Sequence, residues 1–154
     1  MSNHHKKNLK DERVLEFASC ELLLDILYTA TTTYKLDLEA IWIVCCVLHN
    51  TMRIIITDAD AAENYLGAPE VPENLLLSMS RRAIADKTGL SRETVRRRTN
   101  KLLDDGILEA EPNGNVKISQ TFALRDLKAL NQIFQSVGAF NKRLHDHKVR
   151  MPLD

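Results

Sequence analysis

The chain has 154 residues, which is enough to bury a hydrophobic core and suits one compact domain, with or without a dimerisation arm. Its 21 basic and 21 acidic residues balance, so net charge alone indicates no class of partner. The longest apolar run, residues 40–48, is shorter than the ~20 residues that a membrane-spanning helix needs, and residues 1–10 are too polar for a signal peptide. We therefore expect a cytoplasmic protein with no membrane partner.

The charges are unevenly distributed along the chain. Residues 81–98 hold seven basic and two acidic residues, a net charge of +5, whereas residues 54–80 hold five acidic residues and no basic one. The neutral total therefore conceals a basic segment that directly follows an acidic one.

Cys20, Cys45 and Cys46 show no Cys-x-x-Cys spacing, and the last two lie in the apolar run. This pattern favours buried, reduced thiols over a disulfide framework. A redox switch at Cys45 or Cys46 remains an alternative.

The N-terminal part of the chain is predicted to be helical after a short tail. Residues 1–10 are polar, and we expect them to be disordered. From residue 11 to about residue 30 apolar residues recur every three or four positions, which predicts an amphipathic helix. The hydroxyl-rich, β-branched run of residues 29–33 is expected to end this helix.

Asp37 is suited to cap a second helix, which would run from residue 38 to about residue 55. Continuous β-branched runs also occur in buried strands, but the length without glycine or proline favours a helix. It is apolar nearly all round, so we expect a central position and group residues 11–57 as N-terminal helices that pack on the core.

Residues 58–74 form an acidic insert whose glycine and prolines prevent a long element, so a surface loop or short helix is predicted. Asp58, Asp60 and Glu63 lack the glycine and the terminal glutamate that a calcium loop has at fixed offsets. We therefore predict no metal site.

Residues 80–106 predict two helices joined by a tight turn. Ser80 would cap the first helix, residues 81–88, and Gly89 would end it. Ser91 would cap the second, and Gly106 would close it after residue 105. Its inner face would carry Val95, Thr99 and Leu102. Its outer face would carry Arg92, Glu93, Arg96 and Arg97.

A β-hairpin is predicted after these helices, because residues 107–111 and 115–119 flank Pro112-Asn113-Gly114. It would be a small wing within a domain of residues 75–119.

From residue 121 to about residue 148 the apolar residues follow a 3.5-residue spacing. We assign residues 120–150 to a C-terminal dimerisation helix; the alternative is that this helix only completes the core of the monomer.

The residues between Ser80 and Leu108 resemble the winged helix-turn-helix of the Crp/Fnr regulators. The matching stretches are Ser80-Arg81-Arg82-Ala83-Ile84-Ala85, Gly89-Leu90-Ser91-Arg92-Glu93-Thr94-Val95-x-Arg97 and Leu102-Leu103-Asp104-Asp105-Gly106-Ile107-Leu108. The resemblance implies that Arg92, Glu93 and Arg97 read DNA bases. It also implies that Arg81, Ser91 and Thr94 contact phosphate or support such a contact. The chemistry agrees, since arginine can bond bidentately to guanine and glutamate can accept from the cytosine amino group.

The outer helix face and the wing add further candidates. We also expect Arg96 to read DNA bases. We expect Arg82, Asn113 and Lys117 to contact phosphate.

The rest of the chain departs from the Crp/Fnr pattern. Those proteins carry a β-roll ahead of the motif, whereas residues 1–57 are predicted to be helical, so cyclic-nucleotide binding is not carried over. The overall helical arrangement instead resembles that of the dimeric MarR-type regulators. Arg98 and Thr99 stand where both families usually carry apolar residues. We expect Arg98 to lie at the solvent edge or to pair with an acid of the acidic insert.

These patterns predict a mainly α fold with a small β-hairpin wing, in which the N- and C-terminal helices form a dimerisation region. The predicted function is a homodimeric, sequence-specific transcriptional regulator that binds near-palindromic double-stranded DNA. The sequence contains no arrangement typical of an enzyme or a cofactor site, so neither is expected.

The main alternative is a winged helix that binds other proteins and not DNA. A solvated charged face and RNA binding are weaker alternatives. The existence of a small-molecule effector stays open.

Overall fold

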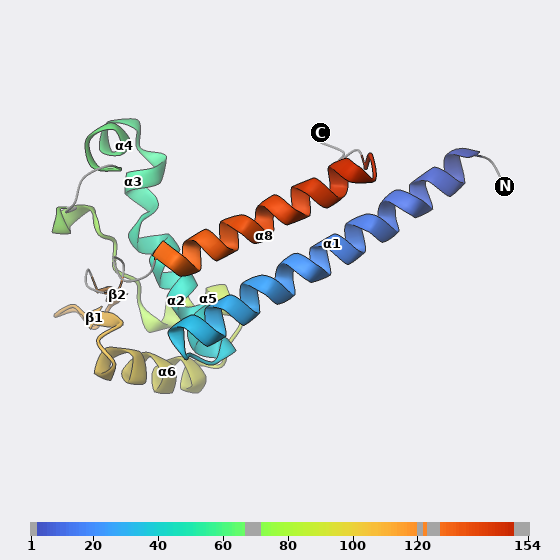
Figure 1. Ribbon diagram of the computed structural model, residues 1–154. Coiled ribbons are helices and arrows are strands. Elements are labelled where there is room, and N and C mark those ends of the chain that lie inside the picture. Colours follow the sequence, from blue (N-terminus) through green and yellow to red (C-terminus); the bar gives the residue numbers. More distant parts are fainter. Residues whose placement is uncertain (1–2, 67–71, 120–121, 123–126, 150–154) are drawn as a thin grey trace. The chain divides into compact units, whose positions relative to one another are not determined.

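The computed structural model describes residues 3–66, 72–119, 122 and 127–149 (Figure 1). It divides into two compact units, one of residues 1–36 and 126–154 and one of residues 37–125. Within the described residues, no helix is both long enough and apolar enough to cross a membrane. The predicted fold class is confirmed: the chain is mainly α, and its described residues include one two-stranded hairpin.

The first unit is a pair of antiparallel helices, α1 (Asn3–Tyr34) and α8 (Leu127–Asp146), which lie side by side (Figure 1). The small side chains of Ala18 and Ala129 are fully buried. Arg143 donates from Nε and Nη2 to the two carboxylate oxygens of Glu21 at 2.8 Å each, and its guanidinium lies 5.0 Å from the ring centroid of Phe17. A bidentate ion pair and a cation–π contact thus fasten the two helices together.

Helix α1 is longer at both ends than the sequence predicts. The expectation of a disordered tail is wrong for residues 3–10, because the helix begins at Asn3. This stretch contains no glycine or proline, and Lys10 donates from Nζ to the backbone carbonyl of His147 at 3.4 Å. The threonine run does not end the helix, since Thr31 and Thr32 donate their hydroxyl protons to carbonyls one turn earlier, at 2.8 and 2.7 Å.

The second unit is built around α2 (Leu38–Thr51), which contacts α5 (Arg81–Thr88), α6 (Arg92–Asp104) and strand β2 (Val116–Ile118). Asp37 caps α2 as predicted, accepting from the Ala40 amide at 3.0 Å. The predicted single helix divides at Met52, because α2 ends at Thr51 and a short α3 (Arg53–Thr57) follows. The fully buried side chains of this unit are those of Ile43, Val47, Thr51, Ile55, Ile84, Val95, Thr99, Leu102, Leu108, Val116 and Ser119.

This arrangement divides the predicted group of N-terminal helices, residues 11–57. Helix α2 belongs to the second unit and α1 to the first. The reason is the apolar surface of α2, which is wide enough to contact two helices and a strand.

The acidic insert contains a short α4 (Ala59–Tyr65), capped by Asp58, and a 3-10 turn, η1 (Glu73–Leu75). The short-helix form of the prediction is therefore the one observed. Residues 67–71 lie outside the described residues. In Figure 1, α4 and α6 lie at opposite ends of this unit.

The predicted wing is present as strands β1 (Leu108–Ala110) and β2, which pair antiparallel with Leu108 opposite Ile118. Met79 exchanges two backbone hydrogen bonds with Val116, at 2.8 and 2.9 Å, so the chain just before α5 extends the hairpin.

The side chain of Lys117, on strand β2, is only 7% exposed, and its Nζ donates to Glu73 Oε1 at 2.5 Å. That hydrogen bond and the lysine's charge lower the pKa of Glu73.

Gly89 ends α5 in the left-handed conformation, with φ of 72°. A Cβ would meet no atom within 4 Å, so the cost of Gly89→Ala comes from the backbone alone. We expect a loss of about 1 kcal/mol in the free energy of unfolding, measured by urea titration.

The matched control is Gly138→Ala, because Gly138 lies inside α8 and a Cβ there also meets nothing within 4 Å. This change should raise the free energy of unfolding by about 0.5–1 kcal/mol. Equal effects at the two positions would contradict the assignment.

The contact between Glu73 and Lys117 predicts a pH-dependent stability. Because the folded-state pKa of Glu73 is lowered, the contact stabilises the fold above the ordinary carboxyl pKa and is lost as the pH falls through the lowered value. The melting temperature should therefore be higher for the wild type than for Glu73→Gln at pH 7, and the difference should vanish once the pH has fallen below the lowered pKa of Glu73. Glu63→Gln, on the exposed surface of α4, is the control and should show no such convergence.

Candidate nucleic-acid interface

Helices α5 and α6 form the predicted pair, and both begin with a serine cap. The Ala83 amide donates to Ser80 Oγ at 3.1 Å, and the Thr94 amide donates to Ser91 Oγ at 3.0 Å. Helix α6 ends at Asp104, one residue before the predicted position, and Gly106 follows with φ of 68°. The local turn chemistry read from the sequence is therefore confirmed.

The inner face of α6 consists of Val95, Thr99 and Leu102, all almost completely buried, as predicted. The buried hydroxyl of Thr99 is satisfied inside the helix, because it donates to the Val95 carbonyl at 2.7 Å. The same oxygen accepts from Arg81 Nε at 3.0 Å. A threonine at this place thus serves as the attachment point for an arginine of α5.

Arg81 connects three elements of the motif. Besides Thr99, its guanidinium donates to Asn100 Oδ1 at 3.2 Å and to the Gly114 carbonyl at the wing turn at 3.5 Å. The side chain predicted to contact phosphate is therefore held between α5, α6 and the wing.

The outer face of α6 brings all four predicted base-reading residues onto the exposed surface. Glu93 and Arg96 form a bidentate pair at 2.9 and 2.7 Å, whose hydrogen bonds lower the pKa of the carboxyl and raise that of the guanidinium. Arg97 lies 4.0 Å from Glu39, a loose contact. Arg92 has no hydrogen bond or ion pair with any described residue. Of the three arginines on this surface, Arg92 thus has no partner among the described residues, and Arg97 has only this loose contact.

Arg98 faces the other way, and the prediction that its partner lies in the acidic insert is wrong. Its Nη1 lies 2.6 Å from Asp37 Oδ2, and its Nη2 and Nε lie 2.8 and 2.9 Å from Glu39 Oε2. The side chain is 22% exposed. Both acids belong to the beginning of α2, which packs beside α6, whereas the insert lies at the far end of the unit (Figure 1).

The remaining residues predicted to contact phosphate differ in accessibility. Arg82 is exposed and only 3.9 Å from Asp86, and Asn113 is exposed at the wing tip. Ser91 and Thr94 share a hydroxyl–hydroxyl bond of 2.9 Å at the start of α6. Lys117 is buried and bound to Glu73, so its position argues against the predicted phosphate contact.

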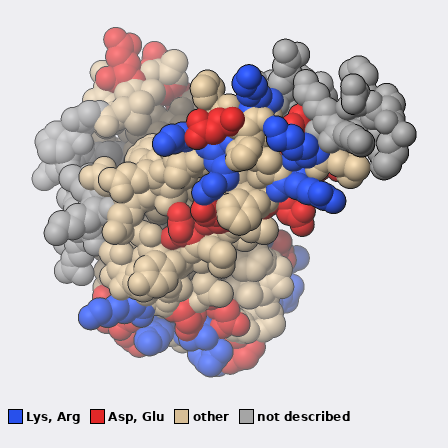
Figure 2. All heavy atoms as spheres, turned by 45° about the vertical axis from the view of Figure 1, so that its right-hand side comes forward, with Lys and Arg blue, Asp and Glu red and all other residues tan. Residues whose placement is uncertain are grey.

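The charge of the surface is mixed. Figure 2 shows basic and acidic side chains interspersed on one face of the molecule. The positive charge of residues 81–98 is partly balanced by acids that are distant in sequence, because Arg98 binds Asp37 and Glu39. An interface here would depend on particular side chains and not on a broad basic field.

The expectation of buried thiols is met only at Cys46, because the residues Cys20 and Cys45 are exposed. Desolvation by burial raises the pKa of Cys45 and Cys46, and Cys46 Sγ lies 3.7 Å from Met79 Sδ. A raised pKa reduces the reactive thiolate form, which weighs against the redox alternative. Among the described residues no group of three His, Cys, Asp or Glu side chains could hold a metal ion.

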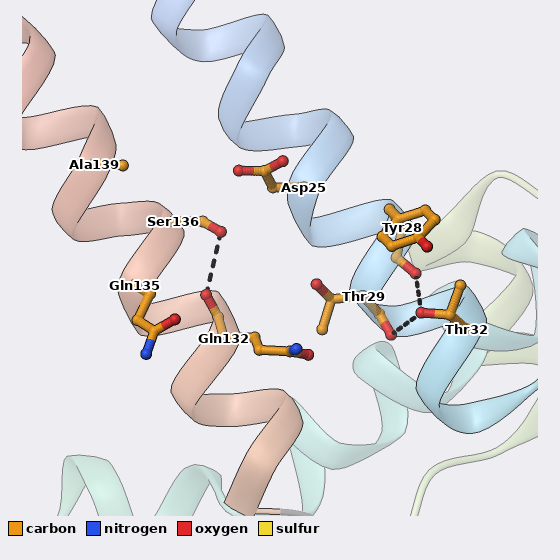
Figure 3. Close-up of a pocket in the computed structure, with 8 residues that line it drawn as sticks. All are labelled: Asp25, Tyr28, Thr29, Thr32, Gln132, Gln135, Ser136 and Ala139. Carbon is orange, nitrogen blue, oxygen red and sulfur yellow. Dashed lines mark hydrogen bonds between the residues drawn. The ribbon is translucent and has the colours of Figure 1, made fainter.

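A groove of about 380 Å³ lies between α1 and α8 in the first unit (Figure 3). It is lined by hydroxyl, amide and carboxylate groups, including those of Asp25, Tyr28 and Gln132. The Thr32 and Ser136 hydroxyl protons are committed to backbone carbonyls of their own helices.

Sequence reasoning missed two residues of the interface. Asn100 binds Arg81, and its position four residues after Arg96 places it on the same helix face, a signal that was available. Glu39 contacts Arg97 and Arg98 from 58 and 59 positions away, so no local pattern could have identified it.

Comparison with protein families matches residues 54–127 to the Crp-like helix-turn-helix domain. The match begins in α3 and includes the insert, both helices of the motif and the wing, but not α1 or α2. Searches of curated proteins and of solved structures each returned no match. Residues 54–127 are therefore similar to a Crp-like helix-turn-helix domain, and this match supports a winged helix-turn-helix regulator of transcription with a Crp-like DNA-reading motif.

Proposed function

We propose that the protein is a sequence-specific DNA-binding homodimer that inserts α6 into the major groove of a near-palindromic site. The observation that carries this proposal is the exposed outer face of α6, where Arg92, Glu93, Arg96 and Arg97 lie on a helix anchored by its opposite face. A helix in this position of a helix-turn-helix contacts base edges with residues near its N-terminus. Two such helices in a dimer would lie roughly 34 Å apart on the DNA.

Base reading by Arg96 and Glu93 requires their mutual ion pair to open. Both side chains are well exposed, and exposed pairs contribute little to stability. The pair can therefore exchange for contacts with guanine and cytosine at small cost. Arg92 has no ion pair to break before it can bind DNA, and Arg97 has to give up only its loose contact with Glu39.

Phosphate contacts are proposed for Arg81, Arg82, Ser91, Thr94 and Asn113. Ser91 and Thr94 lie at the N-terminus of α6, where unpaired amides and the helix dipole favour an anion. Arg81 is held at the junction of the motif and the wing, so a phosphate there would meet a preorganised guanidinium. Lys117 is omitted because Glu73 already binds its ammonium group.

The dimer is proposed to form through the first unit. Apolar side chains are exposed on both of its helices, including Leu24 at 67% and Tyr28 at 71% on α1, and Phe134 at 71% on α8. Exposed apolar side chains gathered on one element pair are typical of an interaction surface. A second copy of the chain would cover them, and the pairing would supply the two-fold symmetry that a near-palindromic site requires.

Selection of bound sequences from random DNA at physiological salt tests the function. The wild type should enrich a motif with two inverted half-sites about 10 base pairs apart, centre to centre. A winged helix that binds only other proteins should enrich no motif, and that outcome would overturn the proposal.

Substitutions on α6 and α5 should have different effects on DNA binding. Arg92→Ala or Arg97→Ala should lower affinity for the selected site and relax preference at one base position each, by ~1–3 kcal/mol. Arg82→Ala should weaken binding to all sequences alike and lower the salt slope by about one. Uniform losses for all three variants, measured by fluorescence anisotropy, would contradict the assigned roles.

The dimer surface can be tested by sedimentation. Leu24→Glu and Phe134→Glu place a charge among the exposed apolar side chains and should each shift the protein from dimer to monomer. Ile56→Glu is the matched control, because Ile56 is 62% exposed but belongs to the second unit. It should leave the dimer intact; dimers that survive both of the first two changes would exclude this surface.

A further inference from the structure

We propose that Asp37 and Glu39, which precede the matched family domain, are positioning residues that set the orientation of α6 through Arg98 and so determine DNA base preference. The inference rests on the proposed function. It assigns a role in DNA recognition to two residues at the start of α2, neither of which is among the residues proposed to contact DNA.

The contacts of Arg98 use its whole guanidinium. Asp37 binds one terminal nitrogen at 2.6 Å, while Glu39 binds the other terminal nitrogen and Nε at 2.8 and 2.9 Å. Two carboxylates on different nitrogens fix both the position and the plane of the group. Asp37 is itself fixed, because its other oxygen accepts from the Ala40 amide at the start of α2.

The position of Arg98 on the helix places it away from the proposed DNA-facing surface. At about 100° per residue, Arg98 lies nearly opposite Arg96 and well away from Glu93. The outer face and the Arg98 side of α6 are thus separate surfaces. Arg98 acts on the outer face by holding the helix in one rotation against α2.

A constraint on the orientation of α6 is needed because few of the side chains of this helix are buried. Only Val95, Thr99 and Leu102 of its side chains are buried, in one narrow stripe. A narrow stripe permits small rotations and tilts of a helix, and a displacement of ~1 Å is enough to misplace a side chain in a recognition site. The ion pairs on one flank and the bond from Arg81 to Thr99 on the other restrain these motions.

Glu39 has a second contact that links the constraint to base reading. The oxygen that binds Arg98 is also 4.0 Å from Nη2 of Arg97, one of the proposed base readers. The carboxylate therefore limits the directions that Arg97 can adopt. Removing its charge should disturb Arg97 and Arg98 together.

The test measures the ratio of affinities for the selected site and for an unrelated DNA sequence, together with the melting temperature, for full-length protein. Arg98→Met keeps the length of the side chain and removes the charge. Its melting temperature should stay close to that of the wild type, because Asp37 and Glu39 are about half exposed and remain hydrated. The affinity ratio should nevertheless fall at least tenfold. Glu39→Gln should lower it in the same direction.

Arg82→Met is the matched control, because it removes an exposed arginine of the same motif. It should weaken binding to both sequences by the same factor and leave the ratio unchanged. Should Arg98→Met fail to fold, Glu39→Gln decides alone, because it keeps Arg98 and its ion pair with Asp37.

The outcomes separate this inference from the proposed function. A wild type that shows no preference for any DNA sequence would overturn the function itself. A wild type with a clear preference that Arg98→Met and Glu39→Gln both retain would overturn only the positioning role. A drop in melting temperature with an unchanged ratio would assign Arg98 to stability alone and likewise overturn it.

Discussion

The ion pairs of Arg98 with Asp37 and Glu39 tie a helix rich in charged residues to the apolar helix of the second unit. Helix α6 is dominated by charged residues and buries one narrow stripe, whereas α2 supplies much of the core of the second unit. A helix of this composition gains little from packing and depends on directional contacts for its orientation. Arg98 on one side and the Arg81–Thr99 bond on the other supply these contacts.

The arginines of the motif consequently have different roles. Arg98 is neutralised by α2, Arg81 is bonded within the motif, and Arg96 is paired with Glu93, which leaves Arg92 and Arg97 as the least restrained cations of the outer face. The net charge of zero for the chain is compatible with this arrangement, because recognition would depend on a few oriented side chains. A DNA-binding surface with so few free charges should discriminate among sequences more than it binds DNA in general.

Features that depend on neighbours in sequence were predictable. The caps at Asp37, Ser80 and Ser91, the left-handed Gly89 and the wing turn at Gly114 each follow from local stereochemistry. Features that depend on distant residues were not predictable. Glu39, which binds Arg98, lies 59 residues away in the sequence. Glu73, which binds Lys117 and is the reason that we propose no phosphate contact for this lysine, lies 44 residues before it. The threonine run of α1 misled the prediction, because its hydroxyls bond back into the helix, which propensity alone does not reveal.

The central claim is that the outer face of α6 meets DNA while Arg98 stays bound to α2. The Nε–H resonances of the arginines, followed by NMR as selected DNA is added, test it most directly. The account predicts that the signals of Arg92 and Arg97 shift on binding and that the signal of Arg98 stays where it is. A shift of the Arg98 signal while those of Arg92 and Arg97 remain unchanged would contradict it.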